Sequence, residues 1–308
     1  QRQVLLESTE VTGYDFAFIA CPSPFSGIGA FKALSDAGVP TGLIFHLAHA
    51  DIRFSPSELD YFKSVDRACS TLICVSDFTR DCVSQAIGLA TSQFLVIENG
   101  IQLPDFDANS CPAFSALLGR QGAKIVLTSG RLHPQKGISV LLSSIEQVCA
   151  QRDDVHFVLA GEGPSRSEIE KFLNDREMKD RVSLLGFVDE PYRIFDVADV
   201  VAMPTLYEGL SLTLLEALHA GACILTTDAS YQDRLLSHGE DSWIVPAGDV
   251  DAFAQGLEIL LGDEALRDRL RTNARKKAKR FTYQRMLDEY FGVVQRSEQL
   301  EPGTTNTD

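Results

Sequence analysis

Short apolar runs alternate with amphipathic segments along almost the whole chain. Apolar runs of strand length that are separated by helix-length segments are typical of parallel sheets with helices on both faces. Four such runs lie before residue 99 and six lie after residue 122. They span residues 14–21, 41–48, 70–76, 93–98, 123–129, 155–161, 181–186, 199–203, 222–227 and 241–246. The pattern therefore predicts an α/β fold with two parallel sheets, each in a Rossmann-like domain.

The segment between the two groups of strands is rich in residues that break regular structure. Asn99-Gly100 is a strong turn dipeptide, and breakers continue as far as residue 121. We place the boundary in this segment, which gives a first domain at 1–105 and a second at 106–282. Helical spacing follows in the last sixty residues, and the polar end at 298–308 is expected to be disordered. The helices predicted there span 250–261, 264–280 and 283–296.

The acidic net charge of the chain makes some classes of binding partner unfavourable. A net charge of -15 over 308 residues argues against nucleic acid, because phosphate backbones attract basic surfaces. The same charge weakens docking on an anionic membrane but leaves room for peripheral membrane contact. No apolar run approaches the roughly 18 residues of a membrane-spanning helix, and residue 1 opens no signal-peptide pattern. Seven scattered cysteines favour reduced thiols, so a cytoplasmic location is expected.

One strand-to-helix junction, residues 203–228, carries the strongest chemical signal. The apolar run before it ends at Pro204, Glu208-Gly209 forms a turn, and helical spacing begins at Leu212. A helix start after a glycine turn offers unpaired N–H groups and the positive end of the helix dipole, which favour a bound phosphate. Two carboxylates, Glu208 and Glu216, would repel that phosphate unless they met hydroxyls or a cation. A ligand with phosphates and many hydroxyls, such as a nucleotide sugar, satisfies both requirements.

Three motifs in this order resemble a known enzyme family. The Glu208-x7-Glu216 pair follows TSGRLHPQKGISVLL at residues 128–142 and FVLAGEGP at residues 157–164. Together they resemble the donor-binding half of retaining GT-B glycosyltransferases of the family 4 type. The resemblance implies two Rossmann-like domains with a donor cleft between them, and a final helix, 283–297, that packs back on the first domain. Against the family pattern the first domain is expected to be incomplete, because its first strands and glycine-rich loop have no counterpart here.

The resemblance also assigns roles to individual residues. Arg131 and Lys136 would hold the donor pyrophosphate, and Glu216 would accept hydrogen bonds from the ribose hydroxyls. Glu208 would contact the transferred sugar and help to stabilise positive charge at its anomeric carbon, near His46. The distal phosphate would face backbone amides, with Ser211 either capping the helix or adding a donor. Those amides belong to Gly209, Leu210, Ser211, Leu212 and Thr213.

The expected reaction moves a sugar from a nucleoside diphosphate sugar to a glycan, lipid or small-molecule acceptor, without a metal or other cofactor. Asp105-Phe106-Asp107 has the form of a D-x-D metal motif, but it follows a turn and is interpreted as linker. A basic loop in solvent would also explain Arg131 and Lys136, and a satisfied core histidine would explain His46. The rival functions are a glycosyl phosphorylase, a nucleotide-sugar epimerase and a non-catalytic fragment that binds nucleotide sugar.

Overall fold

The computed structural model describes residues 15–23, 25–64, 70–102, 122–195, 197–229 and 235–299. The chain forms two compact units. The first joins the chain up to Gly100 to the segment that begins at Tyr283, and the second is Ile101–Thr282. The predicted boundary at 105 and the D-x-D motif lie outside the described residues, as does most of the predicted tail.

The first unit contains a four-stranded parallel sheet in the order β1-β2-β3-β4. All four apolar runs predicted before residue 99 are confirmed as strands. The strands are β1 (Ala17–Cys21), β2 (Thr41–Phe45), β3 (Ser70–Cys74) and β4 (Phe94–Val96). The connecting helices are α2 (Ile28–Asp36), α3 (Pro56–Ser64), α4 (Asp77–Ile87) and the short η1 (Thr91–Gln93). Since the strands advance in one direction and such crossovers are right-handed, α2 to α4 share one face, where Phe31, Phe45 and Phe62 form the core.

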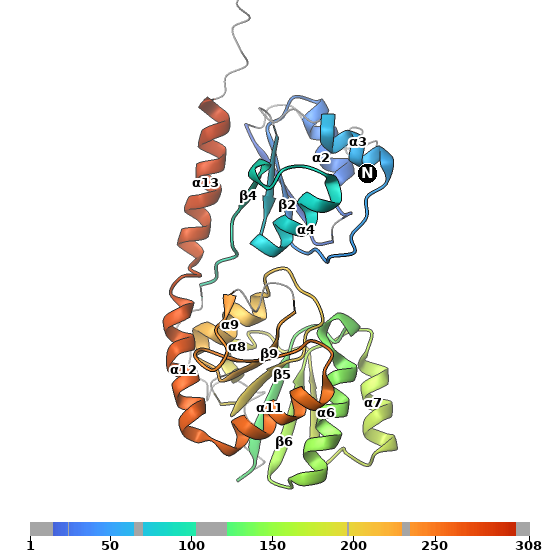
Figure 1. The fold of residues 1–308 in the computed structure, drawn as a ribbon, viewed down its shortest axis with the longest axis vertical. Coiled ribbons are helices and arrows are strands. Elements are labelled where there is room, and N and C mark those ends of the chain that lie inside the picture. Colours follow the sequence, from blue (N-terminus) through green and yellow to red (C-terminus); the bar gives the residue numbers. More distant parts are fainter. Residues whose placement is uncertain are drawn as a thin grey trace, which may run out of the picture. The chain divides into compact units, whose positions relative to one another are not determined.

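The last helix, α13 (Tyr283–Gln299), belongs to this first unit. It lies on the side of the sheet away from α2 and α3 (Figure 1). Tyr290 meets the ring of Phe18 edge to face, with 5.2 Å between the ring centres. Arg285 donates a 2.7 Å hydrogen bond to the carbonyl of Glu98, so the helix is tied to the end of the segment that follows β4.

The second unit contains a six-stranded parallel sheet in the order β10-β9-β8-β5-β6-β7. All six runs predicted after residue 122 are confirmed. The strands are β5 (Lys124–Ser129), β6 (Val155–Ala160), β7 (Val182–Gly186), β8 (Val200–Met203), β9 (Ile224–Thr227) and β10 (Trp243–Val245). The helices are η3 (Pro134–Lys136), α6 (Ile138–Gln151), α7 (Arg166–Asp175), α8 (Tyr192–Phe195), α9 (Leu212–Ala220), α11 (Val250–Gly262) and α12 (Glu264–Ala278).

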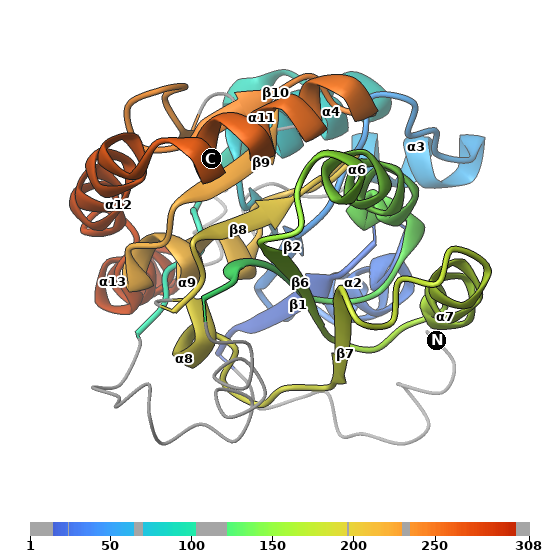
Figure 2. The ribbon, with the colours of Figure 1, turned by 90° about the horizontal axis from the view of Figure 1, so that it is seen from below.

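The strand order of the second unit reverses at β5. From β5 the chain moves outward to β6 and β7, then returns to place β8 on the other side of β5. With right-handed crossovers the reversal puts the connecting helices on opposite faces. Figure 2 shows α6 and α11 along one face and α8 and α9 along the other. In open sheets of this kind, ligands bind outside the carboxyl ends of the strands at the point of reversal, which here lies between β5 and β8.

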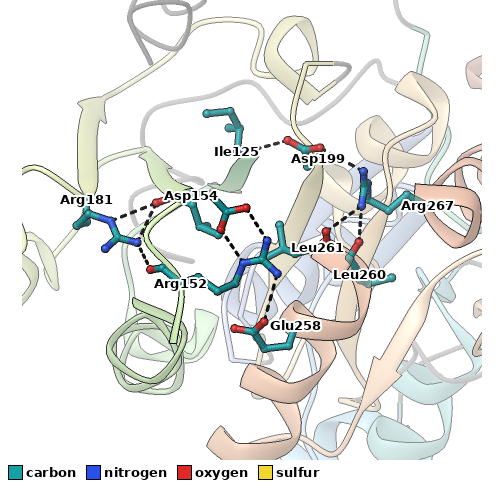
Figure 3. A network of polar contacts seen from close by, with 10 residues as sticks. Ile125, Arg152, Asp154, Arg181, Asp199, Glu258, Leu260, Leu261 and Arg267 are labelled. Atoms are coloured by element: carbon teal, nitrogen blue, oxygen red, sulfur yellow. Dashed lines mark hydrogen bonds and ion pairs between the residues drawn. The ribbon is translucent and has the colours of Figure 1, made fainter. Parts of the chain in front are cut away.

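The opposite, amino edge of this sheet carries a network of ion pairs (Figure 3). Arg152 directly follows α6, and its guanidinium donates hydrogen bonds of 2.8 and 2.6 Å to the carboxylate of Asp154, just before β6. It also lies 3.5 Å from Glu258 on α11. Arg181 donates a 2.6 Å hydrogen bond to the carbonyl of Arg152. The network therefore joins α6 and α11 to the amino ends of β6 and β7. This edge of the sheet is opposite to the edge where a ligand would bind.

Arg267 is the buried member of that network, at 3% exposure. Its guanidinium donates to the carbonyl of Leu260 at 2.7 Å, within the last turn of α11, and lies 3.6 Å from Asp199. The other carboxylate oxygen of Asp199 accepts the N–H of Ile125 at 2.8 Å. A single charge thus links α11 and α12 to the amino ends of β8 and β5.

No helix among the described residues is long and apolar enough to cross a membrane.

Candidate functional site

Two loops meet at the strand reversal of the second unit, one after β5 and one after β8. Leu206 donates its N–H to the carbonyl of Gln135 at 2.8 Å, and the Gln135 side chain donates to the carbonyl of Tyr207 at 3.0 Å. Gly137 has φ 70°, and a Cβ at this position would lie only 1.8 Å from the Pro204 carbonyl oxygen. The glycine therefore permits the close approach that holds the two loops together.

The contact between these loops includes an ion pair of two predicted site residues. Lys136 Nζ donates to Glu208 Oε2. Both side chains are largely buried, at 22% and 15% exposure. The family resemblance implied that Lys136 binds the phosphates and Glu208 the sugar, and the sequence contained no signal that the two would contact each other. In the structure they form one charge-balanced pair beside the reversal.

A cavity of about 580 Å³ opens at the carboxyl ends of β5, β6 and β7. It receives three of the predicted residues: Arg131 from the loop after β5, and Thr213 and Glu216 from α9. The floor is backbone, because Gly161 packs so tightly that a Cβ there would lie 1.8 Å from the Gly130 carbonyl oxygen. The complete lining is Ser129, Gly130, Arg131, Ala160, Gly161, Glu162, Phe187, Val188, Asp189, Glu190, Pro191, Tyr192, Thr213 and Glu216.

The charges around the cavity are unevenly distributed. Arg131 is exposed, and among the described residues it forms no hydrogen bond or ion pair. Glu216 is in the middle of α9, where burial raises the pKa of its carboxyl group above the ordinary 4.5. An open guanidinium suits an anionic oxygen, and a partly desolvated carboxylate gains most from a ligand hydroxyl. The cavity therefore suits a ligand with an anionic end and a hydroxylated portion.

The start of α9 contributes backbone donors beside this cavity. Of the two roles predicted for Ser211, the structure shows the cap: its hydroxyl accepts the N–H of Leu214 at 3.4 Å. The amides of Leu212 and Thr213 belong to the first turn and have no acceptor within the helix. Gly209 and Leu210 are buried in the turn before it. The Ser211 cap therefore occupies the N–H of Leu214 but leaves the N–H groups of Leu212 and Thr213 available to an anion at the predicted site.

His46 belongs to the first unit and follows β2 directly. It lines an apolar cavity of about 430 Å³ with Phe18, Ile44 and residues of α13. Burial lowers the pKa of its imidazole below the ordinary 6.5, which favours the neutral ring. Its predicted place near the donor sugar remains a prediction.

Five charged or aromatic residues of the cavity lining were not predicted from the sequence: Glu162, Phe187, Asp189, Glu190 and Tyr192. Glu162 and Phe187 follow the strands β6 and β7 within two residues, so the rule that ligands bind at the carboxyl ends of strands could have found them. Within the described ranges, no three histidine, cysteine or acidic side chains gather as a metal site. The expectation of a reaction without metal stays a prediction.

The pKa of Glu216 leads to a test of its role. Because the folded state raises this pKa, the protonated form stabilises the fold below the ordinary pKa, and that contribution is lost as the pH rises through the raised value. Glu216→Gln is therefore expected to raise the free energy of unfolding by about 1 kcal/mol at pH 7.5. Thermal unfolding at pH 4.5 should show a smaller difference. Equal stability of the native protein and Glu216→Gln at pH 7.5 would contradict the conclusion that burial destabilises the ionised Glu216 carboxylate.

Comparison with known proteins identifies what the chain resembles. A sequence model of the family described as Glycosyl transferases group 1 matches residues 114–277. The Alpha-D-kanosaminyltransferase of Streptomyces kanamyceticus is 29% identical over 158 residues, which are 51% of this chain and 41% of that protein. The phosphatidyl-myo-inositol mannosyltransferase of Mycobacterium leprae is 30% identical over 229 residues, 72% of this chain and 58% of that protein. The chain thus spans about half the length of the curated relatives it matches.

Solved structures confirm the fold class. A glycosyltransferase from Rickettsia africae superposes with a TM-score of 0.77 at 14% identity, covering 92% of this chain and 77% of that one. Anabaena HepE in complex with UDP and glucose superposes with a TM-score of 0.74 at 21% identity, covering 92% and 78%. The predicted α/β architecture with Rossmann-like parallel sheets, of the GT-B class, is confirmed by this likeness and by the two sheets.

Proposed function

The chain belongs to the glycosyl transferases group 1 family, and on that basis we propose that it transfers a sugar from a nucleoside diphosphate sugar to an acceptor. One observation carries the proposal beyond family membership. An open guanidinium, a helix start and a half-buried carboxylate surround a single cavity beside the strand reversal of the second unit. These three groups suit the phosphates and the ribose of one ligand.

The donor is assigned to this cavity as follows. Arg131 and the first-turn amides of α9 bind the diphosphate, since both present donors to anionic oxygens. Glu216 accepts hydrogen bonds from the ribose hydroxyls, which replace the water that burial has removed from its carboxylate. Lys136 and Glu208 form the ion pair beside the site. A donor offers each member of that pair a new partner, a phosphate oxygen for the ammonium group and sugar hydroxyls for the carboxylate.

The reaction breaks the bond between the anomeric carbon and the diphosphate oxygen, and the electron pair leaves with the diphosphate. The cations Arg131 and Lys136 stabilise the growing negative charge, a role for which other enzymes use a metal ion. The acceptor hydroxyl attacks the same face of the sugar, and its proton passes to the departing phosphate oxygen. This course retains the anomeric configuration and needs no protein nucleophile. Glu208 lies on the sugar side, where it lowers the energy of positive charge at the anomeric carbon.

The acceptor is a glycan, a lipid or a small molecule, and the names of two relatives give a lipid and a lipid-linked saccharide. Related proteins are named for transfer to phosphatidyl-myo-inositol and to a diphospho-undecaprenol-linked saccharide. If the acceptor is linked to a lipid, the protein is expected to contact the membrane peripherally, because the lipid part of the acceptor lies in the membrane. The free cysteines found among the described residues accord with a cytoplasmic location, which forms part of the proposal.

Ligand-linked stability tests the donor site. A nucleoside diphosphate at about 100 times its Kd is expected to raise the free energy of unfolding by about 2.7 kcal/mol, because it binds only the folded state. Glu216→Ala should remove most of this gain, whereas Glu168→Ala, an exposed glutamate at the start of α7, should keep it. Thermal unfolding with UDP, GDP and ADP provides the measurement. No stabilisation by any of the three would overturn the proposed function.

Product analysis separates the rival functions. Nucleoside diphosphate released together with a glycosylated acceptor identifies transfer, and the anomeric coupling constant in the product reports retention. Release of sugar phosphate on addition of inorganic phosphate would identify a phosphorylase. Conversion of the sugar without acceptor would identify an epimerase, and binding without turnover would identify a non-catalytic protein.

A further inference from the structure

The far end of the cavity in the second unit is formed by the loop after β7. If the donor phosphates lie at the start of α9 and the ribose at Glu216, the nucleobase extends along the remaining lining. That lining crosses the ends of β5, β6 and β7, a span of two strand spacings or roughly 10 Å. It ends at residues 187–192, which are therefore the residues that meet the base.

The loop after β7 presents one aromatic face to the cavity. Phe187 lines it and is 76% exposed, the highest value among the large exposed apolar side chains described. A ring so exposed contributes little to the core, whereas a nucleobase stacked on a ring adds roughly 1 to 3 kcal/mol of binding. Phe187 is thus placed as a stacking platform for any base.

The same loop carries the carboxylate of Asp189, which forms no hydrogen bond or ion pair with another described residue. Of the acidic side chains in the lining, Glu162 pairs with Arg166 at 2.6 Å and Glu190 pairs with Arg193 at 2.7 Å. Asp189 is exposed, and within the described residues it forms no hydrogen bond or ion pair. With Glu216 assigned to the ribose, Asp189 is the carboxylate left for the base.

Local contacts fix this loop without a ligand. Glu190 adopts φ 58°, a left-handed conformation that is uncommon for a residue with a side chain. Its carboxylate accepts the Tyr192 hydroxyl and pairs with Arg193, and its carbonyl accepts the N–H of Arg193 at 3.1 Å. These bonds hold the turn at residues 190–193, which directly follows Phe187 and Asp189.

We infer that Asp189 selects guanine, so that the donor is a guanosine diphosphate sugar. Guanine carries two adjacent donors, N1–H and the 2-amino group, which match the two oxygens of a carboxylate. Uracil offers a single N–H flanked by two carbonyl oxygens that a carboxylate repels, and adenine offers its amino group beside a ring acceptor. Ionised carboxylates accept such paired donors strongly. The inference rests on the proposed nucleotide-sugar function and specifies its donor.

Calorimetric titration of the whole chain with GDP, UDP and ADP tests this assignment. GDP should bind at least about 10-fold more tightly than UDP, the ratio expected for about 1.4 kcal/mol of added hydrogen bonding. Asp189→Ala should lower GDP affinity about 10-fold and leave UDP affinity within about twofold. Asp175→Ala, an exposed aspartate at the end of α7, should change neither. Phe187→Ala should weaken the binding of all three ligands by a similar factor, about 5- to 140-fold, and Phe187→Tyr should restore their affinity.

A preference for UDP or ADP, or an equal effect of Asp189→Ala on GDP and UDP, would overturn the guanine assignment while the proposed function stands. Unchanged affinities in Phe187→Ala would overturn the stacking role. Failure of all three nucleotides to bind would overturn the proposed function and this inference together.

Discussion

Replacing Lys136 with alanine is expected to lower the turnover of the nucleoside diphosphate sugar by about 100- to 1000-fold. Removal of one preorganised donor that stabilises developing negative charge has an effect of this size. Lys136 lies on the turn that Gly137 holds against Pro204, so its ammonium group is already positioned when the donor arrives. Initial rates at saturating donor, with the fold checked by thermal unfolding, provide the measurement. Lys171→Ala, an exposed lysine on α7, is the matched control and should retain full turnover.

The ion pair with Glu208 requires a second variant, because Lys136→Ala leaves that carboxylate buried without its ammonium partner. A purely structural pair would show reduced stability in Lys136→Ala, and the double variant Lys136→Ala, Glu208→Gln would recover both stability and turnover. A catalytic Lys136 predicts that the double variant recovers stability alone. Turnover within about threefold of the native protein in either variant would refute the role in leaving-group stabilisation.

Replacing Arg267 with alanine is expected to destabilise the second unit by about 3 to 5 kcal/mol, because it removes a buried guanidinium together with its ion pair and hydrogen bonds. The change strips the partner from Asp199 and from the Leu260 carbonyl, and it opens a cavity at a position that is 3% exposed. For a unit of this size the unfolding temperature should fall by about 10 °C. Calorimetry or circular dichroism during heating provides the measurement.

Arg269 provides the control on the same helix. It is exposed, and its hydrogen bond to the Gly239 carbonyl is 3.2 Å long, so Arg269→Ala should change stability by less than about 1 kcal/mol. Arg267→Met tests the origin of the loss, since it keeps most of the volume without the charge. Equal stability of Arg267→Ala and Arg269→Ala would show that the buried pair adds nothing.

Hydrophobic patterning was sufficient to locate every strand described. Each strand is a mainly apolar run that lies within the sequence window predicted for it, because strands covered by helices favour apolar side chains. The signal also placed Arg131 after a strand and Thr213 and Glu216 in the first turns of a helix, and the structure places all three at one cavity. Their binding roles remain predictions.

Other parts of the site depend on tertiary contacts that patterning does not encode. Lys136 and Glu208 are 72 residues apart, and their pairing follows from the position of β8 beside β5. Phe187 and Asp189 were missed because neither residue type indicates a ligand by itself. Their significance comes from a strand order that the sequence left undetermined.

The turn centred on Glu190 has a consequence for protein engineering. Its stabilising bonds run to Tyr192 and Arg193, a few positions along the chain, so residues 187–191 and these two anchors contain both partners of each bond that holds the turn. A segment of this kind is a natural unit for transplantation between homologous enzymes. Exchanging five residues and their two anchors should transfer the choice of donor base, while the glycine-packed floor and the buried arginine at the opposite edge of the sheet are left untouched.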